Sequence, residues 1–157
     1  MSVQQLSEVK TSHSVTVIGI DPDLVKSGVA ITQSGRLLEL HAMEFFDLIK
    51  LIDERADDAV FVLEDVEASK TVYERPGVKQ KGMKRIAQNV GQVKAIARLL
   101  RQYMEGCGAN FKMVRPLRGN AKKAKNDAKY FKKITGWTGR SNEDKRDAAM
   151  LALFGLK

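Results

Sequence analysis

Two short apolar runs in this chain each end in a carboxylate. Residues 15–20 lead into Asp21, and residues 59–63 lead into Glu64. Both runs are rich in β-branched and aromatic side chains, which is typical of largely buried strands. If the two strands lie side by side and run parallel, both acids leave the sheet at the carboxyl ends of its strands. Open α/β sheets place their ligands at that edge.

The last apolar segment carries two more acids, Asp144 and Asp147. They are three residues apart, so a helix would place them on one face, which continues through Leu151 and Phe154. Because Ser141 precedes Asp144 by three residues, a capping box is possible, and Asp144 would then serve only the helix N-terminus. Asp147 lies a full turn inside the helix on its apolar side, so capping does not explain it. We expect Asp147 to be a metal ligand.

Four carboxylates in such positions predict a site for divalent metal. A charge in line with core residues is costly to desolvate unless it is protonated, hydrogen-bonded or bound to a cation. Hard oxygen ligands suit Mg²⁺, with Mn²⁺ as a substitute. Two ions about 3.5–4 Å apart would activate a water and stabilise the leaving oxygen in phosphodiester hydrolysis. Taken singly, Asp21 before Pro22 is also compatible with a turn, and Glu64 with a polar strand end.

The hydrophobic pattern along the whole chain predicts an α/β fold, with a mixed five-stranded sheet and helices on both faces. We expect strands at residues 15–20, 28–32, 36–41, 60–63 and 110–114, and helices at residues 45–56, 83–104 and 141–154. Residues 64–81 should form a long polar loop, residues 118–133 should be partly helical, and Gly106 and Gly108 should end the longest helix. We expect one domain over residues 15–157, after a flexible polar leader, residues 1–14.

Positive charge is concentrated in the middle of the chain. The net charge is +8, and residues 70–140 hold 19 Lys and Arg against three acids, whereas the remainder holds eight against 16. Such segregation favours a surface for nucleic acid, because each Lys or Arg that neutralises a phosphate releases a condensed counterion. A solvated surface without a partner is the alternative explanation.

Composition excludes several other kinds of site. The single Cys107 leaves no internal disulfide, and two histidines leave no Cys/His cluster for zinc. The chain lacks the Gly-rich strand-to-helix loop of nucleotide-binding ATPases. Residues 1–14 lack the apolar run of a signal peptide, and no segment approaches the length of a membrane span. We therefore expect a cytoplasmic protein without a membrane partner.

Five short motifs resemble those of the RuvC family of Holliday junction resolvases, and the chain is also similar to phage-encoded resolvases of this type. The motifs are residues 17–22, 63–66, 89–93, 114–116 and 144–149. The resemblance spans residues 15–156 and is strongest in the first motif and in the closing Asp-x-x-Asp-Ala. It implies a ribonuclease H-like fold, a homodimer and magnesium-dependent nicking of four-way DNA junctions. It also implies a catalytic tetrad that matches Asp21, Glu64, Asp144 and Asp147.

The chain departs from the family three residues after the second acid, where better-known members carry an aromatic wedge and this chain has Glu67. Tyr73 is the ring available to replace it by stacking on bases, and a packed loop tyrosine is the alternative. The family also uses lysines near the scissile phosphate, and Lys122, Lys123 and Lys125 lie in the matching region. Of these we favour Lys125 as catalytic, because its charge would offset that developing on the phosphate oxygens.

The other basic side chains are assigned to the DNA backbone rather than to chemistry. The predicted DNA-binding residues are Tyr73, Arg75, Lys79, Lys81, Arg115, Arg118, Lys122, Lys123, Lys129, Lys132 and Lys133. The apolar stripe within residues 83–104 is the candidate dimer surface, with an ordinary core contact as the alternative. A two-fold dimer would present two sites for the two cuts that a junction requires.

We therefore predict a structure-selective endodeoxyribonuclease that resolves four-way or other branched DNA by hydrolysis with two metal ions per site. Two alternatives remain open. The same fold and acids would serve a nuclease for RNA–DNA hybrids, which a hybrid substrate would reveal. The basic middle of the chain alone would serve a non-catalytic DNA-binding protein, which would bind DNA without magnesium-dependent cleavage.

Overall fold

The computed structural model describes residues 14–68, 77 and 79–157 of the 157-residue chain. Its strands are β1 (Thr16–Asp21), β2 (Ser27–Gln33), β3 (Arg36–Met43), β4 (Ala59–Glu64) and β5 (Asn110–Val114). Its helices are α1 (Phe45–Arg55), α2 (Gln80–Cys107), α3 (Asn120–Asn126), α4 (Ala128–Thr135) and α5 (Glu143–Phe154), with one 3₁₀ turn, η1 (Val66–Ala68). The order of strands and helices is the predicted one.

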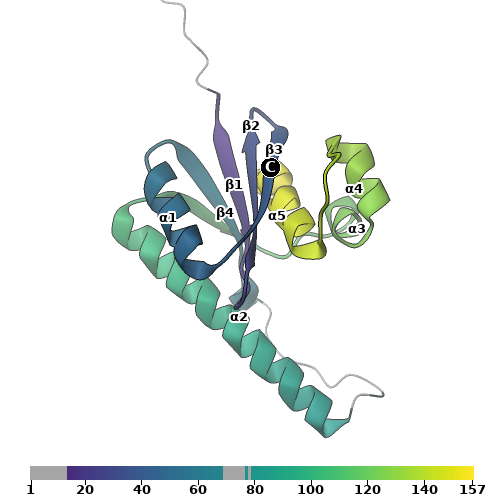
Figure 1. Cartoon of the computed structure of the whole chain (residues 1–157). Helices are drawn as coiled ribbons and strands as arrows, with labels where there is room; N and C mark the ends of the chain where they lie inside the picture. The colour runs from purple at the N-terminus through teal and green to yellow at the C-terminus, as the bar shows by residue number, and fades with distance from the viewer. Residues whose placement is uncertain (1–13, 69–76, 78) are drawn as a thin grey trace, which may run out of the picture.

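The strands form one mixed sheet in the order β3-β2-β1-β4-β5 (Figure 1). β2 is antiparallel to β1 and β3, whereas β4 is parallel to β1 and β5 is parallel to β4. The register pairs Ile20 of β1 with Leu63 of β4, so the next residues, Asp21 and Glu64, leave neighbouring strands at the same edge. The predicted mixed five-stranded sheet is confirmed, and so is the parallel pairing on which the convergence of the two acids depends.

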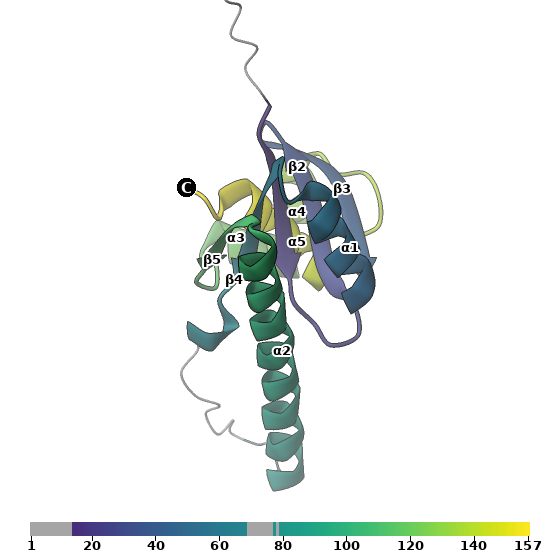
Figure 2. The ribbon, with the colours of Figure 1, turned by 90° about the vertical axis from the view of Figure 1, so that its left-hand side faces the viewer.

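One face of the sheet is covered by α1 and α2 (Figures 1 and 2). Ile20 and Leu63 from the sheet belong to one core cluster with Leu48 of α1 and Leu100 of α2, and all four side chains are fully buried. Apolar residues recur at helical spacing on both helices, which gives each a single face toward the sheet. This core fixes the strand ends that carry Asp21 and Glu64.

The opposite face is covered by α5, whose backbone lies directly against the sheet. A Cβ atom on Gly19 of β1 would lie 1.9 Å from the carbonyl oxygen of Ala148, and one on Gly28 of β2 would lie 2.2 Å from that of Asp144. Only glycine permits this separation between helix and sheet, because no real Cβ atom approaches a backbone oxygen so closely. The two glycines therefore bring the first turns of α5 to the edge at which β1 ends.

α3 and α4 belong to the same side of the sheet as α5 (Figure 1). Ala124 of α3 and Phe131 of α4 are fully buried and share a core cluster with Ala148 and Ala149 of α5. The basic segment that contains them was predicted as partly helical, and it forms two helices that meet at Asp127. The Asp127 carboxylate accepts hydrogen bonds from the first backbone N–H groups of α4, so this residue caps the second helix. Helices on both faces of the sheet are thereby confirmed.

α2 is longer than predicted, and only its C-terminal part packs on the sheet. It begins at Gln80, so the predicted polar loop is shorter than residues 64–81, and it ends at Cys107. Gly108 follows in the left-handed conformation (φ 71°), whereas Gly106 lies inside the helix and does not end it. The buried residues of α2 begin at Ala97, and the N-terminal half stands away from the sheet (Figure 2).

Some predicted features lie outside the described residues. The leader, residues 1–14, is described only at Ser14, and the DNA-binding candidates Tyr73 and Arg75 fall within residues 69–76, which are not described. Among the helices that the structure does describe, none is both long and apolar enough to cross a membrane.

Candidate active site

Carboxylates from three elements meet at the carboxyl-terminal edge of the sheet. Asp21 ends β1, Glu64 ends β4, and Asp147 lies in the second turn of α5. One oxygen from each of the three carboxylates lies within 4.8 Å of the others. Asp21 and Asp147 are buried, and Glu64 is partly buried. The fold thus brings these three predicted ligands together from positions 21, 64 and 147.

The three carboxylates fit a divalent cation. They offer only hard oxygen donors, which favour Mg²⁺ or Mn²⁺ over softer metals. Like charges at this separation repel one another, and burial removes the water that would otherwise stabilise them. A bound dication would allow all three groups to be ionised at once.

Burial raises the pKa of Asp21 to about 8, and the negative charge of Asp147 adds to this effect, while the ammonium of Lys125 opposes it. Burial is also the main cause that raises the pKa of Glu64 and that of Asp147. In the absence of a bound cation, Asp21 therefore keeps its proton at neutral pH. A divalent ion would displace that proton, because the ionised carboxylate is the ligand.

Lys125, in the last turn of α3, reaches the acids. Its Nζ lies 3.4 Å from Oδ2 of Asp147, and 31% of the lysine side chain is exposed. Burial lowers the pKa of Lys125, but the charges of Asp147, Asp21 and Glu64 together outweigh burial and raise it. The side chain therefore brings a permanent positive charge to the cluster.

Asp144 lies one turn before Asp147, at the border of the cluster. It is partly buried and is not among the three residues whose oxygens lie within 4.8 Å of one another. A cavity of about 230 Å³ is lined by Asp23, Val25, Lys26, Gly28, Ala42, Asn142 and Asp144. Burial raises the pKa of Asp144, and the charge of Asp23 raises it further. Of the four acids predicted as ligands, three therefore converge and Asp144 lies beside them.

The N-terminus of α5 is capped by Asn142. Its side-chain oxygen accepts a hydrogen bond from the backbone N–H of Lys145 at 2.9 Å. The hydroxyl oxygen of Ser141 instead accepts a hydrogen bond from the guanidinium of Arg146 at 3.1 Å. The alternative in which Ser141 and Asp144 form a capping box is therefore excluded, because the helix begins one residue later than that motif requires.

The described residues predicted to bind DNA are all exposed and form three groups. Lys79 and Lys81 lie at the N-terminus of α2; Arg115 and Arg118 follow β5; Lys122, Lys123, Lys129, Lys132 and Lys133 lie on α3 and α4. Because β5 is parallel to β4, the second group extends from the same sheet edge as the acids. In the third group, the ammonium of Lys123 lies 4.4 Å from the centre of the Tyr130 ring.

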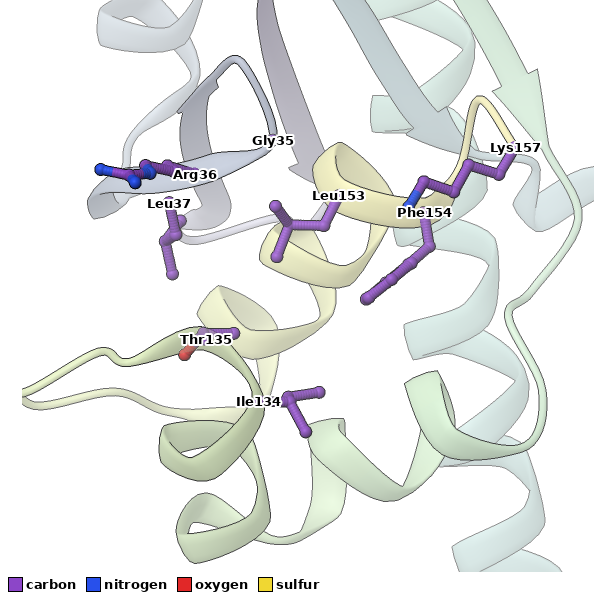
Figure 3. A pocket seen from close by; sticks show the side chains of 8 residues that line it. All are labelled: Gly35, Arg36, Leu37, Ile134, Thr135, Leu153, Phe154 and Lys157. Atoms are coloured by element: carbon purple, nitrogen blue, oxygen red, sulfur yellow. The ribbon is translucent and has the colours of Figure 1, made fainter.

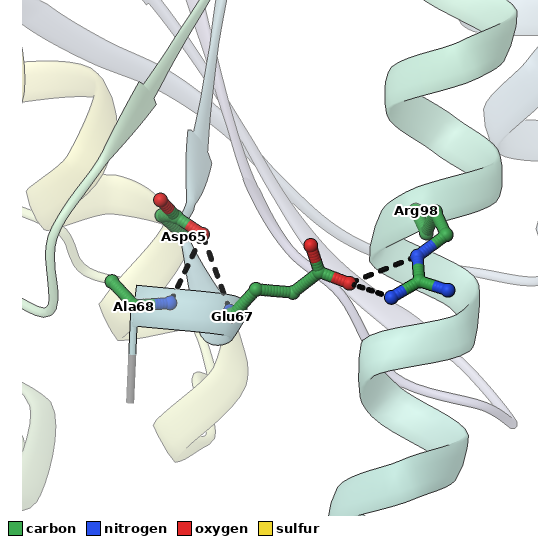
Figure 4. Close-up of polar contacts among 4 residues, drawn as sticks. All are labelled: Asp65, Glu67, Ala68 and Arg98. Carbon is green, nitrogen blue, oxygen red and sulfur yellow. Dashed lines mark hydrogen bonds and ion pairs between the residues drawn. The ribbon is translucent and has the colours of Figure 1, made fainter. Parts of the chain in front are cut away.

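Hydrogen bonds hold the segment after Glu64 in a local turn and join that turn to α2 (Figure 4). Asp65 Oδ1 accepts hydrogen bonds from the backbone N–H groups of Glu67 and Ala68, at 3.2 and 3.3 Å. Glu67 Oε1 in turn accepts two hydrogen bonds from Arg98 of α2, at 2.9 and 2.6 Å. Glu67, where the sequence resemblance would place an aromatic side chain, thus joins η1 to α2.

Sequence reasoning did not single out Arg146, Asp23 or the two glycines that admit α5. Arg146 is buried and lies between the two acids of the closing motif, and Asp23 lies beside Asp144. The glycines did carry a signal, since a glycine inside a β-branched strand often marks a close backbone approach. The burial of Arg146 had no comparable signal, because it depends on how α3 docks on α5.

A larger cavity is separate from the acids. It has a volume of about 360 Å³ and is lined by Gly35, Arg36, Leu37, Ile134, Thr135, Leu153, Phe154 and Lys157 (Figure 3). The β2–β3 turn that forms one wall bonds to Val15, just before β1, whereas Asp21 lies at the other end of that strand. No residue predicted for catalysis or DNA binding lines this cavity, so it is not part of the candidate site.

Comparison with known proteins links this arrangement to one fold. No protein-family model and no curated protein matches the chain. The chain is similar to the structure of Thermus thermophilus RuvC in complex with a Holliday junction substrate, with 16% sequence identity and a TM-score of 0.55 over 88% of this chain and 90% of that chain. A second Thermus thermophilus RuvC structure, also at 16% identity, gives a TM-score of 0.48 over 88% and 92% of the two chains. The predicted ribonuclease H-like fold is confirmed, and the chain folds as RuvC does.

Proposed function

We propose that this protein is a RuvC-type, structure-selective endodeoxyribonuclease that resolves four-way or other branched DNA junctions. The observation that carries the proposal is the convergence of Asp21, Glu64 and Asp147 beside Lys125 at one sheet edge. The RuvC-like fold supports this class of reaction. The exposed cations that extend from the same edge support binding of a polyanion.

The residues of the site divide the chemistry among them. Two Mg²⁺ ions, or Mn²⁺ in their place, would supply when bound the Lewis acidity for attack of water on the phosphorus. Asp21, Glu64 and Asp147 would be the inner ligands, and Asp144 would complete the set from the border of the cluster. The ammonium of Lys125 is close enough to the acids to offset negative charge that develops on the scissile phosphate.

DNA binding would rest on charge around this centre. Arg115 and Arg118 would hold the backbone next to the acids, and the lysines of α2, α3 and α4 would hold more distant phosphates. Tyr73 and Arg75, outside the described residues, remain candidates for contacts at the branch point.

A homodimer is part of the proposal. The N-terminal half of α2 carries Met83, Ile86, Val90 and Val93, which are only partly buried in the single chain. A two-fold contact through this stripe would bring two sites to one junction, as two symmetrical cuts require. We expect the dimer mass in sedimentation; a monomer with full junction activity would contradict this part of the proposal.

The direct test is cleavage of a synthetic four-way junction in Mg²⁺, next to a linear duplex and an RNA–DNA hybrid of the same sequence. We expect the junction to be cut and Asp147→Asn to slow the cut on the order of 10³-fold, because a charged group aimed at the reacting centre is lost. Asp57→Asn, in an exposed turn before β4, is the matched control.

Each substrate gives a separate answer. If Asp147→Asn cuts the junction as fast as the wild type, the site assignment is wrong. If duplex and junction are cut at the same rate, the protein is a nuclease but the proposed selectivity for junctions is wrong. Preferential cutting of the hybrid would support the ribonuclease H-type alternative instead.

A further inference from the structure

Arg146 lies between Asp144 and Asp147 in the sequence of α5 and is buried, with 7% of its surface exposed. Its Nε donates a hydrogen bond to the backbone carbonyl of Lys125 at 2.7 Å, and its Nη1 donates one to Oγ of Ser141 at 3.1 Å. Both acceptors are neutral oxygens. Burial of a guanidinium is costly even when it is hydrogen-bonded, so this placement indicates a role that an apolar side chain could not fill.

The carbonyl of Lys125 lies in the last turn of α3, where carbonyl groups lack partners inside the helix. α3 has only seven residues and packs against α5 through the small side chain of Ala124. A helix this short has little stability of its own, so its position depends on its tertiary contacts. The hydrogen bond from Arg146 fixes the end of α3 that carries Lys125.

α5 contacts Lys125 at both ends of the residue. Arg146 binds the backbone carbonyl, and Asp147, the next residue, lies 3.4 Å from the ammonium. A lysine side chain has a flexible four-carbon stem, so an ion pair at its tip alone does not define its path. With its backbone held as well, the side chain is directed over the acids.

From this geometry we propose that Arg146 is a positioning residue, which fixes the backbone of Lys125 so that the ammonium stands over the acid cluster. The inference rests on the proposed nuclease function and deepens it, since it names the residue that aims the catalytic lysine. Arg146 does not touch the reacting atoms; it acts through Lys125.

The position of Lys125 can be measured without metal and without cleavage. Limited acetylation followed by mass spectrometry reports the reactivity of each lysine. In the wild type we expect Lys125 to react several-fold more slowly than Lys122 on the same helix, because Lys125 is partly buried and paired. In Arg146→Gln we expect Lys125 to approach the reactivity of Lys122, with Lys122 itself unchanged. Wild-type reactivity of Lys125 in Arg146→Gln would overturn the proposal.

A double-mutant cycle tests the consequence for catalysis. We expect Arg146→Gln to lower kcat for junction cleavage about 10-fold, as for other residues that orient a functional group. The junction Kd, measured in Ca²⁺ to prevent cleavage, should not change. In a Lys125→Ala background, Arg146→Gln should have no further effect on kcat. An equal effect in both backgrounds would overturn the proposal, because Arg146 would then act through something else.

Two further variants test whether an effect of Arg146→Gln on Lys125 comes from lost positioning, from the lost positive charge or from misfolding. Lys145→Gln removes one positive charge from the same turn of α5 and should leave the reactivity of Lys125 unchanged. If Arg146→Gln does not fold, Ser141→Ala removes only the second hydrogen bond of Arg146, and it should raise the reactivity of Lys125 to a smaller extent. No rise in Ser141→Ala would overturn the proposal as well. A wild-type protein that cuts no junction would refute the proposed function, whereas acetylation would still decide whether Arg146 places Lys125.

Discussion

The acid cluster and the N-terminal half of α2 both carry charges that we assign to function, but they are built differently. At the cluster, buried carboxylates are held by a sheet and by a helix so close that Gly19 and Gly28 cannot bear a side chain. Between Gln80 and Ala97 of α2, no described side chain is fully buried, and a Cβ atom on Gly91 would meet nothing within 4 Å. Phosphodiester chemistry requires fixed geometry, whereas binding of a polyanion requires mainly charge within reach.

The sharpest test of this contrast is Gly19→Ala. The added methyl group would meet the carbonyl oxygen of Ala148 at 1.9 Å, and backbone cannot move aside cheaply. We expect the free energy of unfolding to fall by about 3 kcal/mol or more, and junction cleavage to be lost because Asp147 moves away from Asp21. Urea denaturation and the cleavage assay measure the two effects. Wild-type stability would show that the spacing between α5 and the sheet does not depend on glycine.

A second test concerns the proton on Asp21 when metal is removed. Its pKa is about 8 in the folded state and near 3.8 in the unfolded chain, so the folded state binds more protons between these values. The free energy of unfolding therefore falls as the pH rises through this window. In EDTA we expect the wild type to lose roughly 3–4 kcal/mol between about pH 5 and pH 8, and Asp21→Asn to lose much less.

Added Mg²⁺ distinguishes the proton effect from general alkaline instability. The ion should restore the stability of the wild type at about pH 8, because it binds the folded state with ionised carboxylates. The same addition should have a much smaller effect on Asp21→Asn. A wild-type profile that stays flat in EDTA would show that the acids are not forced together in the metal-free protein.

The role of the N-terminal half of α2 in binding is tested by the double variant Lys79→Gln/Lys81→Gln. Since both lysines are exposed and lie at the end of α2 that stands away from the sheet (Figure 2), we expect kcat to stay at the wild-type value. Junction affinity should fall about fivefold, and the slope of log K against log salt should decrease by roughly two. A fall in kcat at saturating junction would show that α2 takes part in the geometry of the site.

The smallest expected effect is that of Gly91→Ala, the counterpart of Gly19→Ala. The new methyl group would lie in open space inside a helix, where alanine is favoured over glycine. We expect a gain of about 0.5 kcal/mol in the free energy of unfolding, with unchanged cleavage. A loss of stability would show that this part of α2 is packed against something, and a second copy of the chain would be the first candidate.

The sequence allowed prediction of the sheet edge because strand periodicity and the acids that end the strands can be read locally. Asp147 could be recognised for the same reason, as a charge on an apolar stripe. Lys125 was favoured through family resemblance, since Lys122, Lys123 and Lys125 have the same chemistry in sequence. Only the docking of α3 on α5 distinguishes them, by bringing Lys125 to Asp147 and leaving the other two exposed.

Other parts of the site depend on tertiary contacts that no local pattern carries. Arg146 follows three charged residues at the start of a helix, where exposure is the default, and it is buried where α5 meets α3. Asn142 and Ser141 are both good helix caps, so the sequence did not decide which of them begins α5. The anchor between Glu67 and Arg98 joins residues 31 apart, and its charges fit many partners.

The contact between Lys125 and Asp147 also affects the order in which the chain could fold and bind an ion. Many small metal-dependent domains cannot fold until their ion arrives. At the proposed metal site, the ammonium of Lys125 supplies part of the counter-charge itself, so the native topology can be reached first and the ion can bind last. Under the proposed function, a cell short of the ion would hold folded but inactive protein, which would become active when the ion is supplied, without new synthesis.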